Sequence, residues 1–65
     1  MTITVNGQPR EVADGTSVST LLAGMKLTPE RVAVELNRRL LKTERYAEPL
    51  KANDQIEVVT FVGGG

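Results

Sequence analysis

The residues best suited to chemistry stand at the carboxyl end of the chain, where Phe61 and Val62 are followed by Gly63, Gly64 and Gly65. Glycine adds no side chain to a core, and ordering it costs more backbone entropy than ordering any other residue. A fold gains nothing from three such residues, so the pattern favours their use by another molecule. A glycine segment is slim enough to enter a narrow channel and present its terminal carboxylate there. The alternative is a frayed chain end without a role.

The rest of the chain offers little for catalysis. It contains no His and no Cys, which excludes a histidine general base, thiol nucleophiles, disulfides and zinc sites built from His and Cys, and no paired-carboxylate spacing stands out. Its 65 residues are also too few to enclose a sizeable pocket. We therefore predict no catalytic residue, no metal ligand and no bound cofactor. The sequence favours a carrier or substrate on which partner enzymes act, and not an enzyme.

The overall composition indicates one small domain without a strong electric field. Eight basic residues balance eight acidic ones, so nothing draws the whole chain to nucleic acid or to anionic lipid. No apolar run approaches the roughly 20 residues of a membrane helix, and no signal-peptide core follows Met1. We predict no nucleic-acid or membrane partner and a cytoplasmic location.

The first half of the chain has the pattern of a β-hairpin followed by a helix. Residues 2–5 alternate β-branched apolar and polar side chains, Asn6-Gly7 is a strong hairpin signal, and a second strand is expected over residues 8–13, with Val12 inward and Pro9 marking an edge. Ser17 is a suitable N-cap for a helix with one apolar face, formed by Val18, Leu21, Leu22 and Met25. Lys26 is expected in the last turn, before Thr28-Pro29 ends the helix.

The second half is expected to return to the sheet. Alternation predicts a strand over residues 31–36, a turn at 37–39 and a short strand at Leu40-Leu41. A single helical turn over residues 43–46, capped by Thr43, and a turn at Asn53-Asp54 precede a last strand over residues 55–62. That strand places Ile56, Val58 and Thr60 on one face and Val59 and Phe61 on the other.

This order of elements predicts an α+β fold with a mixed sheet of four to five strands and one main helix packed on one face. If the last strand pairs in parallel with the first, it lies centrally, which is the ubiquitin-like β-grasp arrangement. Residues 1–62 would form the domain and residues 63–65 a flexible glycine tail.

With these elements assembled, the chain resembles the ThiS-type sulfur-carrier proteins of the ubiquitin-like β-grasp superfamily, which act in thiamine biosynthesis. The resemblance covers essentially the whole chain, and the segments that carry it are Val5-Asn6-Gly7, Asp14-Gly15-Thr16-Ser17-Val18, Leu21-Leu22, Val34-Glu35-Leu36-Asn37 and Val59 to Gly65. The terminal Gly64-Gly65 pair is shared across the superfamily. It therefore does not select a pathway, whereas the short chain and the Phe-Val-Gly-Gly-Gly ending look more like the thiamine carriers.

The resemblance implies covalent chemistry at Gly65. A ubiquitin-activating-type adenylyltransferase (ThiF-like) would use ATP and magnesium to convert the Gly65 carboxylate to an acyl-adenylate. A sulfur donor such as a cysteine desulfurase would then supply the sulfur of a thiocarboxylate, which a thiazole synthase (ThiG-like) accepts. Gly63 and Gly64 would thread the partner active site.

Three other functions stay open on the sequence: a sulfur carrier for molybdopterin or cysteine synthesis, a non-covalent β-grasp binding module, and a protein-conjugating modifier.

Two surfaces also have alternative interpretations. Val59, Phe61 and Val62 form either an apolar docking surface for partners or a face covered by the loop around residues 46–50. The cations Arg38, Arg39, Lys42 and Arg45 form either a solvated loop or a patch that steers an acidic partner.

Overall fold

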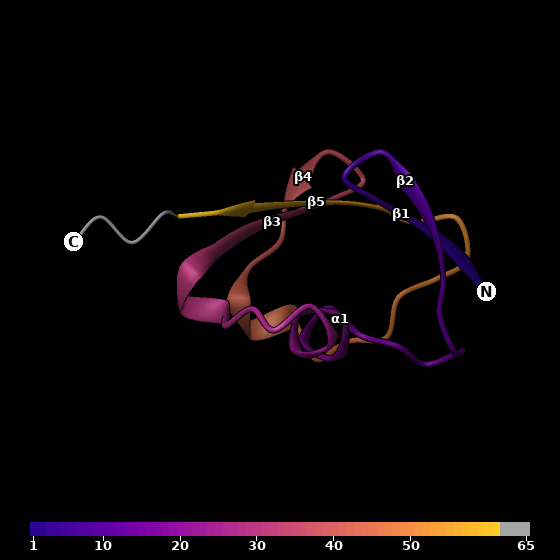
Figure 1. Cartoon of the computed structure of the whole chain (residues 1–65), viewed down its shortest axis with the longest axis horizontal. Coiled ribbons are helices and arrows are strands. Elements are labelled where there is room, and N and C mark those ends of the chain that lie inside the picture. The colour runs from indigo at the N-terminus through magenta and orange to yellow at the C-terminus, as the bar shows by residue number, and fades with distance from the viewer. Residues whose placement is uncertain (62–65) are drawn as a thin grey trace.

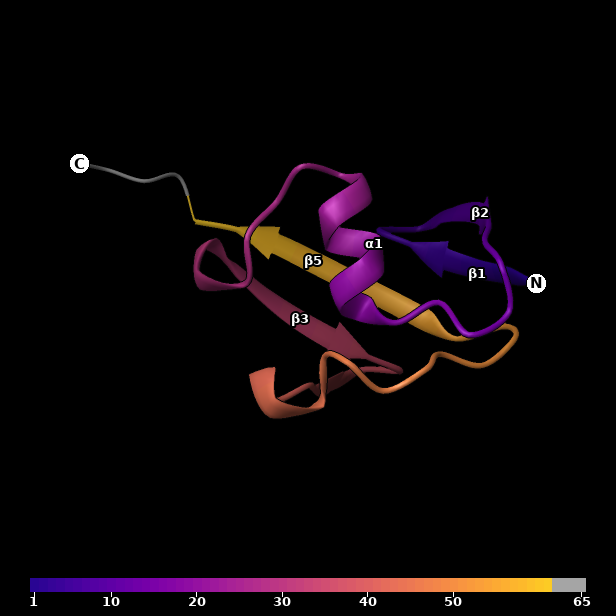
Figure 2. The same cartoon turned by 90° about the horizontal axis from the view of Figure 1, so that it is seen from below.

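The computed structural model describes residues 1–61, and these form one mixed sheet with a helix on one face (Figures 1 and 2). The elements are β1 (Thr2–Val5), β2 (Gln8–Glu11), α1 (Val18–Gly24), β3 (Val32–Leu36), β4 (Arg39–Leu40) and β5 (Gln55–Thr60), with short 3₁₀ helices η1 (Pro29–Arg31) and η2 (Thr43–Arg45). The five strands lie in the order β2-β1-β5-β3-β4. This order is the predicted β-grasp fold.

Strand β5 is the centre of the sheet. It pairs in parallel with β1, where Val5 lies beside Ile56, and antiparallel with β3 along its whole length, from Leu36 opposite Ile56 to Val32 opposite Thr60. The parallel pairing of the first and last strands confirms the prediction. Only the start of β5, at Gln55 and Ile56, has a strand on each side, and β3 alone pairs with the residues nearer the glycines.

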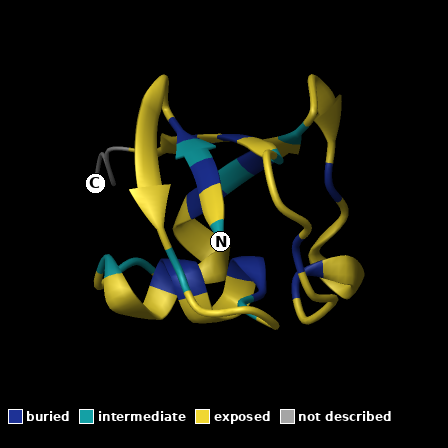
Figure 3. Cartoon of the chain, turned by 90° about the vertical axis from the view of Figure 1, so that its right-hand side faces the viewer, coloured by how far each residue is buried: buried dark blue, intermediate teal, exposed yellow. Residues whose placement is uncertain are grey.

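The core lies between the sheet and α1, and Figure 3 shows the buried residues gathered there. Every second residue of β1, β3 and β5 points into it, as the period-2 pattern predicts. The helix contributes the apolar face expected from its spacing. The buried apolar residues are Ile3, Val5, Val18, Leu21, Leu22, Val32, Val34, Leu41, Tyr46, Leu50, Ile56 and Val58.

Helix α1 starts as predicted and ends earlier than predicted. The Ser17 hydroxyl accepts a hydrogen bond from the Thr20 N–H at 3.2 Å, so Ser17 is the N-cap. The helix ends at Gly24, and Lys26 follows it with φ 59°, outside the last turn where we expected it. The N–H groups of Lys26 and Leu27 donate to carbonyls of the helix, at Ala23 and Leu22, which is a Schellman ending. Glycine usually occupies the position of Lys26 in this ending, so the residue types alone do not predict it.

The seven residues of α1 form the only α-helix of residues 1–61, and no helix in that part of the chain is long and apolar enough to cross a membrane.

Both hairpins turn over two residues with positive φ, but only the first turn has the predicted boundaries. Asn6 and Gly7 have φ 50° and 79°, as their types predict. The second turn is Asn37-Arg38, with φ 52° and 71°, and not the three residues we expected. Arg39 therefore already pairs with Leu36, which shifts β4 one residue earlier than the predicted strand at residues 40–41.

The asparagines of the two turns also bind β5 through their side chains. The Oδ1 atom of Asn6 accepts from the Val58 N–H at 2.7 Å, and the Oδ1 atom of Asn37 accepts from the Gln55 N–H at 2.9 Å. The backbone N–H groups of the same two asparagines donate to the carbonyls of Ile56 and Gln55. Each hairpin turn therefore clamps the central strand.

The segment after β4 returns to the helix side of the molecule. The predicted helical turn is present as η2, but Lys42 takes the cap position and no side chain caps it, so the expected Thr43 cap is wrong. Beyond η2, the Tyr46 carbonyl accepts from the Ser19 N–H at 2.9 Å, and the Leu50 N–H donates to the Thr16 carbonyl at 2.8 Å. These bonds hold Tyr46 and Leu50 against α1, where both side chains are buried.

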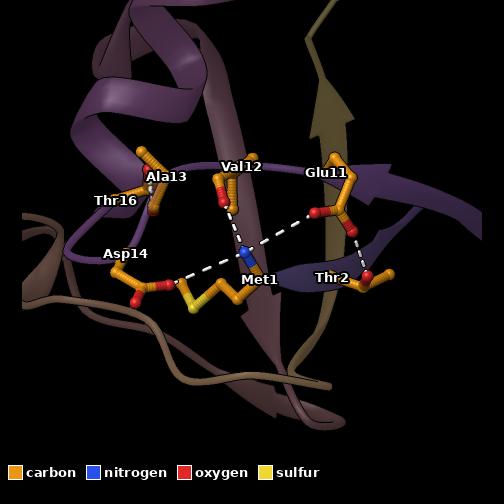
Figure 4. A network of polar contacts seen from close by, with 7 residues as sticks. All are labelled: Met1, Thr2, Glu11, Val12, Ala13, Asp14 and Thr16. Atoms are coloured by element: carbon orange, nitrogen blue, oxygen red, sulfur yellow. Dashed lines mark hydrogen bonds and ion pairs between the residues drawn. The ribbon is translucent and has the colours of Figure 1, made fainter.

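A polar network joins the amino end of the chain to the segment after β2 (Figure 4). The Met1 ammonium donates to the Val12 carbonyl at 2.7 Å and lies 3.6 Å from carboxylate oxygens of both Glu11 and Asp14. The Thr2 hydroxyl donates a short hydrogen bond to Glu11. That bond and, next, the nearby ammonium hold the pKa of the Glu11 carboxyl below its ordinary value of 4.5.

Candidate functional site

The candidate site is the carboxyl end of β5, at the end of the long axis opposite Met1 in Figure 1. Backbone hydrogen bonding continues beyond the β3–β5 pairing to the last described residue, because the Phe61 N–H donates to the carbonyl of Arg31, which ends η1, at 2.8 Å. Val62, Gly63, Gly64 and Gly65 lie outside the described residues, so the predicted roles of these four residues stay predictions. The described part of the site is the surface from which these residues depart.

Val59 and Phe61 form an exposed apolar surface on the face of the sheet away from α1. Their side chains are 58% and 56% exposed, whereas their neighbour Val58 points into the core. Period-2 alternation places Val59 and Phe61 on one face, and Ala33 lies opposite Val59 on β3. The alternative in which residues 46–50 cover this face is wrong, because Tyr46 and Leu50 are buried on the helix side.

Farther from the tail, the same face carries two adjacent acidic residues. Glu35 and Glu57 lie directly opposite each other on β3 and β5, both are exposed, and neither is in an ion pair with a described residue. Like charges placed opposite each other destabilise a sheet. Leu40, which is 73% exposed, lies opposite Glu35 on β4. The open face therefore combines exposed apolar side chains with two carboxylates.

The four predicted cations differ in their ion pairing. Arg45 binds Glu48 with its Nη2 atom 3.0 Å from the carboxylate, and the hydrogen bond and charge of Glu48 raise the Arg45 pKa above its ordinary value. Arg38, Arg39 and Lys42 lie at the β3–β4 hairpin and just after it, and within residues 1–61 none of them is in an ion pair. Arg45 is therefore paired with a carboxylate, although it lines the same shallow hollow as Arg39, and the role of the four cations stays a prediction.

The described residues do not assemble a catalytic centre. Residues 1–61 contain no group of three or more Asp, Glu, His or Cys side chains placed to hold a metal ion. A depression of about 240 Å³ lies between the end of β3 and the loop after η2, but its polar side chains bind each other, as in the hydrogen bond from Asn37 to Asp54. Among residues 1–61, the candidate site is therefore the exposed apolar surface beside Phe61.

A family model described as the ThiS family matches residues 3–65, nearly the whole sequence. The chain belongs to the ThiS family. A solved structure of the thiamine biosynthesis protein ThiS from Geobacter metallireducens is 40% identical, with a TM-score of 0.79, and each chain covers 100% of the other. The family assignment and the structural match confirm the resemblance seen in the sequence and its fold.

Two relatives show different contexts for ThiS-family sequences. The sulfur carrier protein ThiS of Bacillus subtilis is 43% identical over 53 residues, which cover 80% of each chain. A thiazole synthase of Magnetococcus marinus is 46% identical over 66 residues, which include the whole of this chain but only 20% of that protein. This chain therefore spans about a fifth of the length of the Magnetococcus relative.

Sequence reasoning missed two features of the sheet. The strand registers that place Glu35 opposite Glu57 depend on long-range pairing, which a single strand pattern does not encode. The second feature is the pair of side-chain hydrogen bonds from β5 to Asn6 and Asn37, because the sequence pattern predicts only turns at these positions. One sequence signal for these bonds is that both hairpin turns start with asparagine, whereas glycine follows only in the first turn.

Proposed function

We propose that this chain is a sulfur carrier for thiamine biosynthesis whose Gly65 carboxylate is the covalent site. The observation that carries the proposal is that the family match runs to residue 65 and so includes all three glycines. The described residues support a carrier because they present an exposed apolar surface beside the departing chain end and no catalytic group. The acids, bases and magnesium would belong to partner enzymes.

The chemistry proceeds in two stages. A carboxylate is a poor electrophile, so the adenylyltransferase joins the Gly65 carboxylate oxygen to the α-phosphorus of ATP and releases pyrophosphate. The terminal sulfur of a donor persulfide then attacks the Gly65 carbonyl carbon and expels AMP. A thiol cleaves the resulting sulfur–sulfur bond and is itself oxidised to a disulfide, which leaves the thiocarboxylate on Gly65.

Thiazole synthase is the proposed acceptor of this sulfur. The Magnetococcus relative named thiazole synthase includes a segment similar to this whole chain. Joining two modules in one polypeptide raises the effective concentration of each for the other. That arrangement supports a thiazole synthase partner for this chain, while the tail chemistry alone would also suit a carrier for molybdopterin or cysteine synthesis.

The proposed docking surface for these enzymes is formed by Val59, Phe61 and Val62. Exposed apolar side chains next to one another mark interaction sites more often than isolated ones do. This surface adjoins the tail, so a partner that covers Val59 and Phe61 can receive the glycines at the edge of the same contact.

The intact mass of the protein tests the proposal after incubation with ATP, the adenylyltransferase of the same organism and a persulfide donor. We expect an increase equal to one oxygen replaced by one sulfur. A variant without Gly65 is the control, and it should not change in mass. An unchanged wild-type mass, with an enzyme shown to be active on another ThiS-family carrier, would contradict the carrier function and favour a non-covalent binding module.

The acceptor needs a separate measurement. The thiocarboxylate form should bind a thiazole synthase, and sulfur should appear in the thiazole product. Transfer instead to a molybdopterin synthase subunit or to a cysteine-forming enzyme would move the carrier to another pathway. High-molecular-weight conjugates of Gly65 in cell lysates would indicate a protein modifier.

A further inference from the structure

Arg38 occupies a backbone conformation that does not suit its side chain. Its φ of 71° lies in the left-handed region, at the second position of the β3–β4 turn, where glycine is strain-free. Among residues 1–61, the other positive-φ positions hold glycine or asparagine, except for Lys26 at the end of α1. Both cations are exposed, but Lys26 completes the ending of α1, whereas Arg38 lies next to β4 and its exposed Leu40, and strain retained there points to a use for the Arg38 side chain.

The surroundings of Arg38 suit contact with a folded protein. We define the hairpin tip as Arg38, Arg39 and Leu40. It combines two cations without an ion-pair partner in the described chain with a leucine that is 73% exposed. In Figure 1 the β3–β4 turn rises on the side of the sheet away from α1. Period-2 alternation along β5 places Val59 and Phe61 on that side too. Arginine beside apolar area is typical of protein interfaces.

The hairpin tip lies at the opposite end of β5 from the tail. Leu36, which immediately precedes the turn, pairs with Ile56, and Phe61 lies five positions after Ile56 along the chain. At the usual rise of a strand, these five steps span about 17 Å. One apolar contact beside the tail leaves the domain free to rotate about that contact. A second contact at this distance would fix its orientation.

We infer that the hairpin tip is a second docking point, which receives an acidic surface of the adenylyltransferase while Val59 and Phe61 contact the enzyme beside its active site. This inference rests on the proposed function for the identity of the enzyme. A protein surface fits better than a polyanion, because Glu35 and Glu57 on the same face would repel nucleic acid or anionic lipid. A partner with an acidic group facing Arg38 and a cation facing the two glutamates complements the whole face.

The test compares two variants that make the same change at different places. Arg38→Gly and Lys26→Gly each replace a cation at positive φ by glycine, so both should relieve backbone strain and raise the urea midpoint. Binding to the adenylyltransferase is measured at low and moderate salt. We expect Arg38→Gly to weaken binding about five- to tenfold, mainly through a slower, less salt-dependent association rate, while Lys26→Gly stays within about twofold of wild type.

A second variant at the same position tests whether the loss of binding comes from the missing charge and not from the introduced glycine. Arg38→Asn retains a residue that tolerates positive φ and removes the charge, so it should lose binding as Arg38→Gly does. Equal binding by the Arg38 and Lys26 variants would overturn the inference. So would an unchanged urea midpoint for Arg38→Gly, or a loss of binding to heparin or phosphatidylserine vesicles without a loss of binding to the enzyme.

The outcome is distinguishable from failure of the proposed function. If wild-type protein acquires sulfur at Gly65 but Arg38 is neutral in binding, only the second docking point is wrong. If wild-type protein never acquires sulfur with an active enzyme, the carrier function itself is wrong, and the inferred partner falls with it.

Discussion

At the scale of single residues, stability depends on a few side chains between the sheet and α1. Leu21 is 4% exposed, whereas Leu40 is 73% exposed on the β3–β4 hairpin. Leu21→Ala should therefore reduce the free energy of unfolding by about 2–5 kcal/mol, because it removes buried methyl groups and leaves a cavity. Leu40→Ala makes the same chemical change at the surface and should stay within about 0.5 kcal/mol of wild type. Urea unfolding measures both, and equal losses would contradict the inward direction of Leu21.

Glu11 gives a residue-scale prediction about pH. Its pKa is lowered in the folded protein, first by the Thr2 hydroxyl and then by the Met1 ammonium. A lowered folded pKa stabilises the fold above the ordinary value of 4.5, and this stabilisation is lost as the pH falls through the folded pKa. Wild type should therefore exceed Glu11→Gln in urea midpoint at neutral pH, and the difference should disappear in acid. Glu44→Gln removes the same charge away from this network and serves as the control.

At the scale of elements, the two hairpin turns hold the central strand. Asn6→Gly keeps the positive φ of the turn but removes the acceptor of the partly buried Val58 N–H, which should cost about 1–3 kcal/mol. Asn37→Gly likewise removes the acceptor of the Gln55 N–H. Because Gln55 is exposed, water can replace the lost acceptor, and the loss of unfolding free energy should be smaller. Thermal unfolding of both variants checks the order, and a greater loss for Asn37→Gly would contradict this account of the clamp.

These elements also show what the sequence can predict and where it stops. The patterns of residues 2–5, 18–25 and 55–60 identify their elements, because period and capping are local properties. The early end of α1 and the shifted β4 were not predictable in this way, since Lys26 and Arg38 adopt a conformation for which their types give no signal. The open side of Val59 and Phe61 was also undecided, because it depends on where residues 46–50 pack in three dimensions.

At the scale of the whole molecule, the helix and the proposed docking surface lie on opposite faces of the sheet. Binding and folding should therefore be separable by mutation. Phe61→Ala removes an aromatic ring that is 56% exposed, so the urea midpoint should change little, while affinity for the adenylyltransferase should fall about tenfold or more. Thr60→Ala alters the adjacent residue on the other face and is the control. A Phe61→Ala protein that binds normally once folded would contradict the docking role.

The backbone bond between Phe61 and Arg31 has a consequence for the geometry of any enzyme that acts on Gly65. It holds Phe61 against Arg31, the last residue of η1, so four residues, 62 to 65, separate this bond from the carboxylate proposed to react. Four residues, even when fully extended, span at most about 14 Å. Under the proposed function, the phosphate of ATP and the incoming sulfur would both have to come within that distance of the enzyme surface that covers Phe61.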